Sequence, residues 1–393
     1  MKKFIRKFLT LLALCAALFG GISCFILFGL PEQFGNTYQH ALYLQVQALP
    51  RIKSPKIVVV GDSSVPFSLD CARMSGMMKE PVQTLGIHSG TGAEYVLNLA
   101  KDSIRKGDIM VLELAPDQAD DSFSPSIVLT ACENHFEMYR CFTLDDWEKV
   151  IRYYPTYLAK KVKYYFGVRD SEMPPYSIRS FNADGNFIYR RLGSRMAVHL
   201  NKNERDTTFS RKEYDESLIV FLNNYNSYCT QKGATFLITF SPFLDESLAP
   251  GASGFTDVQN YLSHKLQAPV ITKISARELP RRYFYNNAVH CNTAGAEKVT
   301  EDLAHEIRAY LNRGKQNTGR VVKVKSGGIV SCRILSLPVA GTGKRNVKIS
   351  KAVPSGGVNK RAVKILKVSP FTAANRPSAK TTISLQKQIC PRV

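Results

Sequence analysis

Three short segments combine reactive or polar side chains with positions at the ends of predicted strands. The first is Gly61-Asp62-Ser63-Ser64, which directly follows a β-branched run. A serine on a tight turn at the carboxyl end of a strand is well placed to act as a nucleophile, and the following helix N-terminus favours an anion there. The same residues also make an ordinary turn and helix N-cap. The segment therefore needs partners elsewhere in the chain before it indicates catalysis.

The second segment, residues 85–92, is rich in small residues and contains Gly86 and His88. Small residues allow backbone N–H groups to face a shared cavity, as an oxyanion hole requires. A flexible glycine-rich turn is the simpler alternative. We expect His88 to shape this loop beside a bound substrate rather than to act as the base.

The third segment, residues 287–296, precedes the last predicted helix and contains His290. Thr293 is a suitable N-cap for that helix, which would hold the loop in place. A histidine there could accept a proton from Ser63. A lone histidine is otherwise an ordinary surface residue, so the hypothesis depends on all three segments meeting at one edge of a sheet.

The elements that would position these segments alternate between strands and helices. Strands are predicted at 56–60, 81–86, 109–112, 234–240 and 269–272, and helices at 93–105, 214–231, 256–266 and 293–311. Such alternation is typical of an α/β fold with a mainly parallel sheet. Residues 117–210, with a helical stretch at 145–158, interrupt the pattern. This insertion is either a cap over the carboxyl ends of the strands or a plain helical addition.

The order of the three segments over residues 56–312 resembles the SGNH/GDSL hydrolase superfamily. Within it, the chain is similar to membrane-anchored envelope members such as D-alanyl transfer proteins and polysaccharide O-acyl esterases or transferases. The resemblance implies a flavodoxin-like three-layer α/β/α sandwich without a cofactor. It also implies that Ser63 is the nucleophile, that His290 is the base, and that the Ser63 and Gly86 N–H groups form the oxyanion hole. The chemistry would be acyl transfer through an acyl-serine to water or a sugar hydroxyl of an envelope glycopolymer.

Two departures from the family pattern affect the expected activity. Asn287 stands where the family has an Asp that orients the histidine, and an Asn can favour the wrong imidazole tautomer. No Gly-x-Asn-Asp block follows the strand at 109–112, although Asp245 or Glu246 could supply a substitute carboxylate. Two hypotheses therefore stay open: a Ser–His esterase or acyltransferase, and an inactive scaffold that binds a glycan or a protein partner.

The N-terminus predicts a single-pass membrane anchor over residues 1–30, followed by a connector over 31–55. An uncharged run of 23 residues, 8–30, follows a basic cluster made of Lys2, Lys3, Arg6 and Lys7. About 20 apolar residues suffice to cross a bilayer, and the basic flank predicts a cytoplasmic N-terminus with the body outside. A cleaved signal peptide and lipidation at Cys24 are the alternatives.

The net charge of +21 is concentrated at the C-terminus of the 393-residue chain. Residues 313–393 contain 18 of the 53 basic residues and no acidic one, whereas residues 31–312 contain 31 basic and 32 acidic residues. A nucleic-acid-binding body is therefore excluded. The tail is predicted to be disordered and to contact anionic polymers or lipids. Alternatively, it is a shifted reading frame. No CxxC or Cys/His pair has the spacing of a metal site, so no metal is expected.

Overall fold

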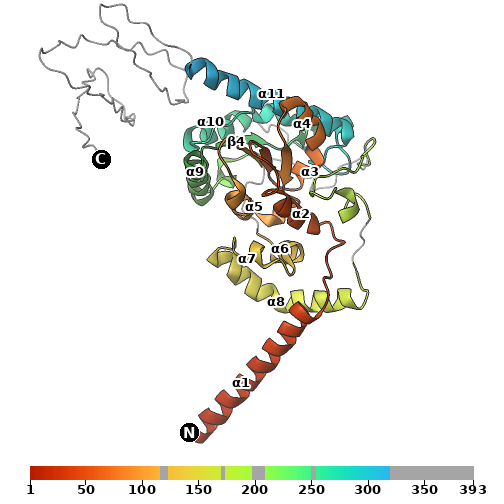
Figure 1. Cartoon of the computed structure of the whole chain (residues 1–393), viewed down its shortest axis with the longest axis vertical. Coiled ribbons are helices and arrows are strands. Elements are labelled where there is room, and N and C mark those ends of the chain that lie inside the picture. Colours follow the sequence, from red (N-terminus) through yellow and green to blue (C-terminus); the bar gives the residue numbers. More distant parts are fainter. Residues whose placement is uncertain (116–122, 170–172, 197–208, 249–253, 319–393) are drawn as a thin grey trace, which may run out of the picture. The chain divides into compact units, whose positions relative to one another are not determined.

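The computed structural model describes residues 1–115, 123–169, 173–196, 209–248 and 254–318 (Figure 1). The strands are β1 (Ile57–Val60), β2 (Val82–Leu85), β3 (Ile109–Leu114), β4 (Thr235–Phe240), β5 (Phe243–Leu244) and β6 (Glu278–Leu279). The α-helices are α1 (Lys2–Cys24), α2 (His40–Ala48), α3 (Ser64–Ser68), α4 (Cys71–Met78), α5 (Ala93–Ala100), α6 (Pro125–Cys132), α7 (Phe136–Tyr139), α8 (Leu144–Tyr165), α9 (Glu216–Gln231), α10 (Phe255–Lys265) and α11 (Thr293–Thr318).

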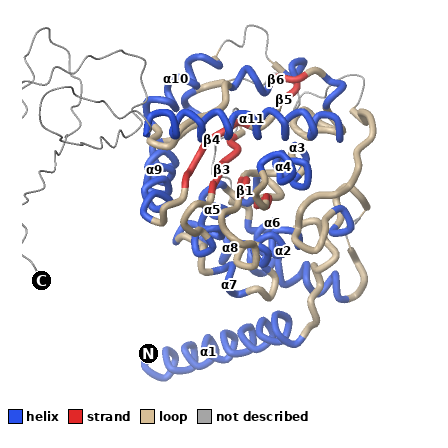
Figure 2. Tube along the Cα trace, turned by 45° about the horizontal axis from the view of Figure 1, so that its top comes forward, coloured by secondary structure: helices blue, strands red, loops and turns tan. Residues whose placement is uncertain are grey.

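The central element is a four-stranded parallel sheet with the order β2-β1-β3-β4 (Figure 2). This confirms the predicted α/β class and its mainly parallel sheet. The strand predicted at 269–272 is wrong, because Val270 forms only an isolated bridge with Ile238. The chain turns away after this bridge into a 3₁₀ turn at Ile274–Arg277, so no further ladder forms.

Alternate residues of the strands enter two different apolar clusters, as the two-residue period of a strand requires. Ile57 and Val59 pack in one cluster with Met74 of α4 and Leu303 of α11. Val58 and Val60 lie in the other cluster, together with buried residues of α2, α5 and α9. Because both faces of the sheet are covered, β1 is apolar throughout rather than alternating.

The order in which strands are added to the sheet reverses between β1 and β3. From β1 the chain passes through α4 to β2 on one side, whereas it later passes from β3 through α9 to β4 on the other side. Parallel sheets bind ligands outside the carboxyl ends of their strands at such a point. Close packing there requires glycine, because a Cβ on Gly86 would lie 2.0 Å from the carbonyl oxygen of Gly61.

The predicted insertion contributes two structural parts. Helices α6, α7 and α8 form the first, and α8 starts at a capping box in which Thr143 and Asp146 bond each other's backbone N–H groups. The second part, here called the strap (residues 173–196), has little regular structure. Residues 117–122, 170–172 and 197–208 of the predicted insertion lie outside the described residues.

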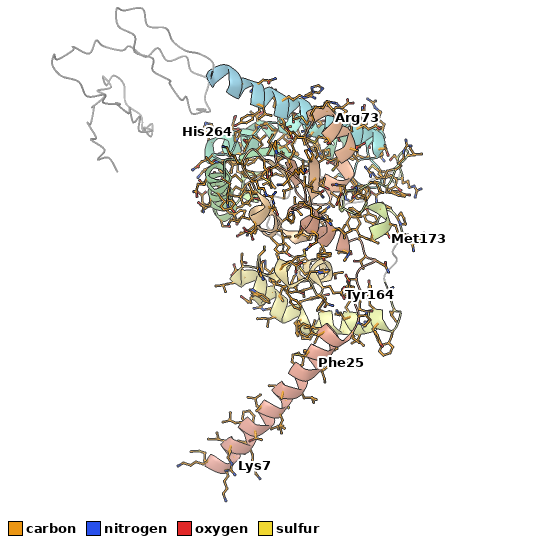
Figure 3. The ribbon with its side chains drawn as sticks, viewed as in Figure 1. Lys7, Phe25, Arg73, Tyr164, Met173 and His264 are labelled. Atoms are coloured by element: carbon orange, nitrogen blue, oxygen red, sulfur yellow. The ribbon has the colours of Figure 1, made fainter. Side chains whose placement is uncertain are left out.

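The N-terminal helix is long and apolar enough to cross a membrane over Lys2–Gly29, judged by length and composition. It consists of α1 and a π-helical turn, η1 (Phe25–Gly29). Lys7 and Phe25 lie toward its opposite ends in Figure 3. Ile26 packs against Leu158 of α8, and the Phe28 ring stacks on Phe136 at 5.5 Å between ring centroids. The end of the apolar helix is therefore packed against the inserted helices.

The last helix, α11, begins at Thr293 but is capped differently from the prediction. Asn292 Oδ1 accepts a hydrogen bond from the Gly295 N–H, whereas Thr293 Oγ1 accepts one from the Arg191 N–H of the strap. The helix extends to Thr318, beyond the predicted end at 311. The rest of the basic tail, 319–393, lies outside the described residues.

We expect Asp108→Ala to lower the free energy of unfolding by about 3–5 kcal/mol, because it leaves a buried ammonium without its partner. Lys56 Nζ lies 2.7 Å from Asp108 Oδ2, and both side chains are fully buried at the start of β1 and β3. Chemical denaturation measures the effect. Asp184→Ala, which removes the exposed Arg51–Asp184 pair, is the control and should change stability far less. Equal effects would contradict this assignment.

Candidate active site

Ser63 and His290 meet at the carboxyl edge of the sheet, although 227 residues separate them in the sequence. Ser63 Oγ lies 3.0 Å from His290 Nε2, within the reach needed for proton transfer. The His290 ring stacks on Phe67 of α3 with 4.0 Å between ring centroids. The two candidate side chains therefore have a direct hydrogen bond and a fixed ring plane.

Both residues are held by the elements that flank them. Ser63 follows β1 and is the N-cap residue of α3. The His290 loop is held by backbone hydrogen bonds, from Tyr285 N–H to the His290 carbonyl and from Leu244 N–H to the Ala288 carbonyl. The first of these bonds lies beside an antiparallel bridge between Phe284 and Cys291. His290 is thus positioned by backbone pairing rather than by a loop alone.

The contacts of His290 Nδ1 determine which tautomer the ring adopts. Asn287 Oδ1 accepts hydrogen bonds from the N–H groups of Val289 and His290, so its amide nitrogen is the atom that faces the ring. That nitrogen lies 3.0 Å from Nδ1, and an amide nitrogen can only donate. The contact favours a neutral ring with an unprotonated Nδ1 and a proton on Nε2, facing Ser63. Asn286 Oδ1, at a longer 3.3 Å from Nδ1, favours the opposite tautomer.

His290 is neutral at physiological pH in this environment. Burial lowers its pKa to about 3, and the nearby charge of Arg191 acts in the same direction. The described residues include no carboxylate that is hydrogen-bonded to the ring. Nothing in this part of the chain therefore offsets the cost of charging the imidazole.

A second hydroxyl, Ser64, connects two carboxyl groups beside the candidate nucleophile. Ser64 Oγ lies 2.6 Å from Asp62 Oδ1 and 2.7 Å from Glu113 Oε1. A hydroxyl has one proton and can donate to only one of them, so the other contact requires a protonated carboxyl. Burial raises the pKa of Glu113 to about 7, which identifies Glu113 as the group that carries the proton near neutral pH.

Gly86 is positioned differently from the predicted oxyanion donor. Its N–H donates to Gln45 Oε1 at 2.9 Å, and the Gln45 side chain is completely buried. His88 Nδ1 accepts a hydrogen bond from the Gly90 N–H, which places the proton of the neutral ring on Nε2. Both residues of the second segment thus shape the loop, and the Gly86 N–H is already satisfied.

The strap supplies contacts that the motifs did not indicate. Tyr176 Oη lies 3.1 Å from His290 Nδ1. The buried Arg191 guanidinium donates to the carbonyl groups of Phe67 and Cys291, which flank Ser63 and His290. Arg191 therefore links helix α3, which follows Ser63, to the loop that contains His290. The abundance of Tyr and Arg in the insertion was the only sequence signal for this arrangement.

The alternative carboxylates proposed from sequence have other partners. Glu246 is exposed and pairs with Arg281, and Asp245 Oδ1 accepts a hydrogen bond from the Glu246 N–H. Neither bonds His290. The residues after β3 that would contain the missing Asn block include 116–122, which lie outside the described residues.

The free energy of unfolding of the wild type should fall as the pH rises from about 5 to 8, because Glu113 loses its proton in the folded protein. In Glu113→Gln this fall should be absent. The pKa of Glu113 is about 7 in the folded protein and near 4.5 otherwise. The stabilisation from its proton is therefore complete below pH 4.5 and is lost as the pH passes through 7. Its size is on the order of 3 kcal/mol.

Urea denaturation at both pH values measures this difference between Glu113→Gln and the wild type. Glu278→Gln, which changes an exposed carboxyl of β6, is the control and should leave the wild-type pH dependence unchanged. A pH-independent difference between Glu113→Gln and the wild type would show that Glu113 is ionised throughout.

No protein-family model and no curated protein matches this chain. The resemblance to the SGNH/GDSL superfamily therefore depends on the three short segments alone. The contact between Ser63 and His290 and their place at the edge of the sheet are structural observations that do not depend on that resemblance.

Proposed function

We propose that the chain is a membrane-tethered serine esterase or O-acyltransferase of the SGNH type, which forms an acyl-Ser63 intermediate. The observation that carries the proposal is the 3.0 Å contact between Ser63 Oγ and His290 Nε2. The strand order 2-1-3-4 and the helices on both faces support a flavodoxin-like three-layer arrangement. The position of Ser63 beside the change in chain direction supports a ligand site there.

In the proposed reaction, His290 Nε2 takes the proton of Ser63 Oγ while that oxygen attacks the acyl carbonyl carbon. The carbonyl oxygen becomes an oxyanion, and Nε2 then returns the proton to the leaving alkoxide. In the second half, water or a sugar hydroxyl loses its proton to Nε2 and attacks the carbonyl carbon of the acyl-serine. The bond between that carbon and Ser63 Oγ then breaks, and Nε2 returns the proton to Oγ. This sequence requires Nε2 to be unprotonated, so the ring must first adopt the tautomer that the Asn287 contact disfavours.

The oxyanion would be stabilised by the Ser63 N–H at the start of α3 and by the Nε2–H of His88. The Gly86 N–H is not assigned this role, because Gln45 already accepts its hydrogen bond. His88 is a suitable donor because its Nδ1 is an acceptor, so the neutral ring presents a proton on the other nitrogen. Burial lowers the pKa of His88, whereas the charge of Asp62 acts in the opposite direction.

The proposed substrate is an acylated envelope glycopolymer, with the body outside the cell membrane and the N-terminus in the cytoplasm. The apolar helix and the basic residues before it support this location, because such a flank stays on the cytoplasmic side. The acyl acceptor decides between an esterase, which uses water, and a transferase, which uses a sugar hydroxyl. The proposal covers both outcomes.

A non-catalytic glycan- or partner-binding protein of the same fold is the second candidate. Two observations favour it: the Gly86 N–H is occupied, and the Asn287 amide directs the imidazole proton toward Ser63. Both features would weaken an acyl-transfer enzyme. Neither feature covers Ser63, which is partly exposed and could contact a bound sugar.

Wild-type protein should be labelled once per chain, at Ser63, by a fluorophosphonate probe, and Ser63→Ala should remove the labelling. The probe traps an activated serine hydroxyl because Oγ displaces fluoride from its phosphorus. His290→Ala should slow labelling, since Oγ loses its proton acceptor. Intact mass spectrometry measures the adduct.

Ser227→Ala is the control for this experiment, because Ser227 is an exposed serine on α9. It should be labelled as fast as the wild type. An unlabelled wild type would favour the binding protein, and equal labelling of Ser63→Ala would place the reactive serine elsewhere.

Asn287→Asp should accelerate labelling of Ser63 at least tenfold. A carboxylate at this position can still accept the two backbone N–H bonds, and its second oxygen would accept a hydrogen bond from the Nδ1–H of His290. It would thereby leave Nε2 free to act as a base and raise the pKa of His290. The reverse change costs serine proteases about ten-thousand-fold in rate, which is an upper bound here.

Asn182→Asp is a matched control for this variant. Asn182 Oδ1 also accepts two backbone N–H bonds, from Asp184 and Asn186, but it has no histidine partner among the described residues. Its labelling rate should equal that of the wild type. If Asn287→Asp reacts no faster than the wild type, the tautomer does not limit the reaction.

A further inference from the structure

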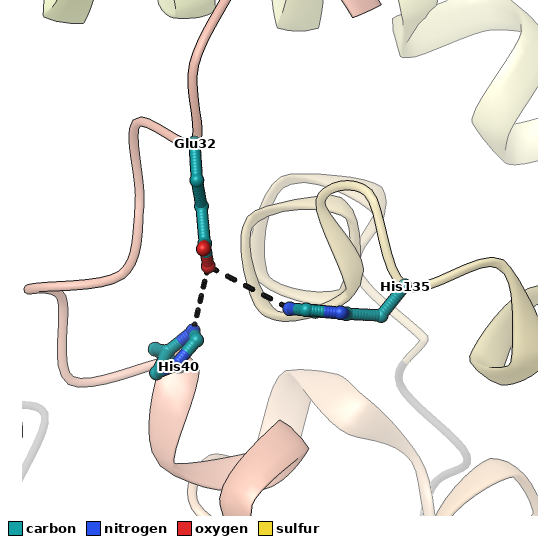
Figure 4. A group of neighbouring side chains, drawn as sticks. All are labelled: Glu32, His40 and His135. Carbon is teal, nitrogen blue, oxygen red and sulfur yellow. Dashed lines mark ion pairs between the residues drawn. The ribbon is translucent and has the colours of Figure 1, made fainter. Parts of the chain in front are cut away.

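Three potential metal ligands converge where the chain leaves the apolar helix. Glu32 lies just after that helix, His40 starts α2, and His135 lies between α6 and α7. Figure 4 shows the Glu32 carboxylate between the two imidazole rings. Glu32 Oε1 lies 3.3 Å from His40 Nδ1 and 3.6 Å from His135 Nε2, and the three ligand atoms lie within 4.8 Å of one another.

We propose that Glu32, His40 and His135 bind one Zn²⁺ ion, with water in the fourth position. Zinc is bound by imidazole nitrogens and carboxylate oxygens at about 2.0–2.2 Å, usually in a tetrahedral arrangement. Ligand atoms at that radius are about 3.4 Å apart along a tetrahedral edge. The two separations from Glu32 Oε1 lie close to this value, and the two histidine nitrogens are at most 4.8 Å apart. An ion therefore fits between the three atoms once the two rings approach each other by at most about 1.4 Å. Imidazole ligands also favour zinc over calcium or magnesium.

The histidine nitrogens are in a suitable state to bind an ion. His135 Nε2 is buried and has no hydrogen-bond partner in the described part of the chain. The His135 ring is also held by a parallel stack on Tyr43, with 3.3 Å between ring centroids.

A buried ion pair next to the cluster holds its segments together. Glu133 accepts hydrogen bonds from the backbone N–H groups of Gln33 and Phe34, directly after Glu32, and its charge is paired with Lys161 Nζ at 2.8 Å. Glu133 itself lies two residues before His135. The segment that carries Glu32 and the turn that carries His135 are therefore fixed to each other without the metal.

The role of the ion would be structural. It would cross-link the connector to the turn between α6 and α7, next to the end of the apolar helix. The zinc site shares no residue with the Ser63–His290 pair, so a test of one does not decide the other. The spacing of residues 32, 40 and 135 matches no short metal motif, and for that reason the sequence predicted no metal.

The test uses the full chain in detergent, purified with an affinity tag that contains no histidine. After removal of metals by a chelator, the protein is dialysed against Zn²⁺, and bound metal and thermal unfolding are measured. We expect one zinc per chain and a rise in the unfolding temperature of the wild type. Glu32→Gln and His135→Asn should each weaken zinc binding at least tenfold and remove most of that rise.

His264→Asn is the control, because His264 is an exposed histidine on α10 (Figure 3). It should bind zinc as the wild type does. Zinc X-ray absorption of the wild type provides a readout that does not depend on the folding of any variant. Two imidazoles with oxygen ligands are expected there. Sulfur ligands, no retained zinc, or equal binding by Glu32→Gln, His135→Asn and the wild type would overturn the proposal.

Discussion

The architecture of the candidate site depends on one feature of the sheet: the chain goes from β1 to β2 at one edge and from β3 to β4 at the other. This arrangement opens the carboxyl edge of the sheet at one point, and the Ser63 turn occupies that point. Close contact between the backbones of Gly61 and Gly86 then brings the loops after β1 and β2 together. Any side chain at Gly86 would push these loops apart. The position of Ser63 therefore depends on a glycine that has no reactive group of its own.

Burial, rather than ion pairing, sets the protonation states around this edge. The same desolvation keeps His290 neutral by lowering its pKa and Glu113 protonated by raising its pKa. In a triad, a buried carboxylate stabilises the charged imidazole, but here Asn287 occupies that place. The hydrogen bond between Ser63 and His290 is therefore present without the carboxylate that makes catalytic Ser–His pairs fast.

Local patterns in the sequence were sufficient for the parallel sheet and for the Ser63–His290 pair. The β-branched run of β1 and the turn residues after it are short-range signals. The partners of the site are not, because Gln45, Tyr176 and Arg191 reach it from the segment before β1 and from the strap. The roles predicted for Gly86 and Thr293 differ from the structure for the same reason, because each residue bonds a group far away in the sequence. The Gly86 N–H donates to the Gln45 side chain, and Thr293 Oγ1 accepts from the backbone N–H of Arg191.

The separation of 227 residues between Ser63 and His290 also has a consequence for timing. The chain is made from its N-terminus, so Ser63 emerges early and His290 emerges only with the last helix of the body. Arg191, which links their flanking segments, is made between them. Ser63 Oγ therefore has no His290 partner while the chain is incomplete, and a truncated product that ends before residue 290 would lack this hydrogen bond.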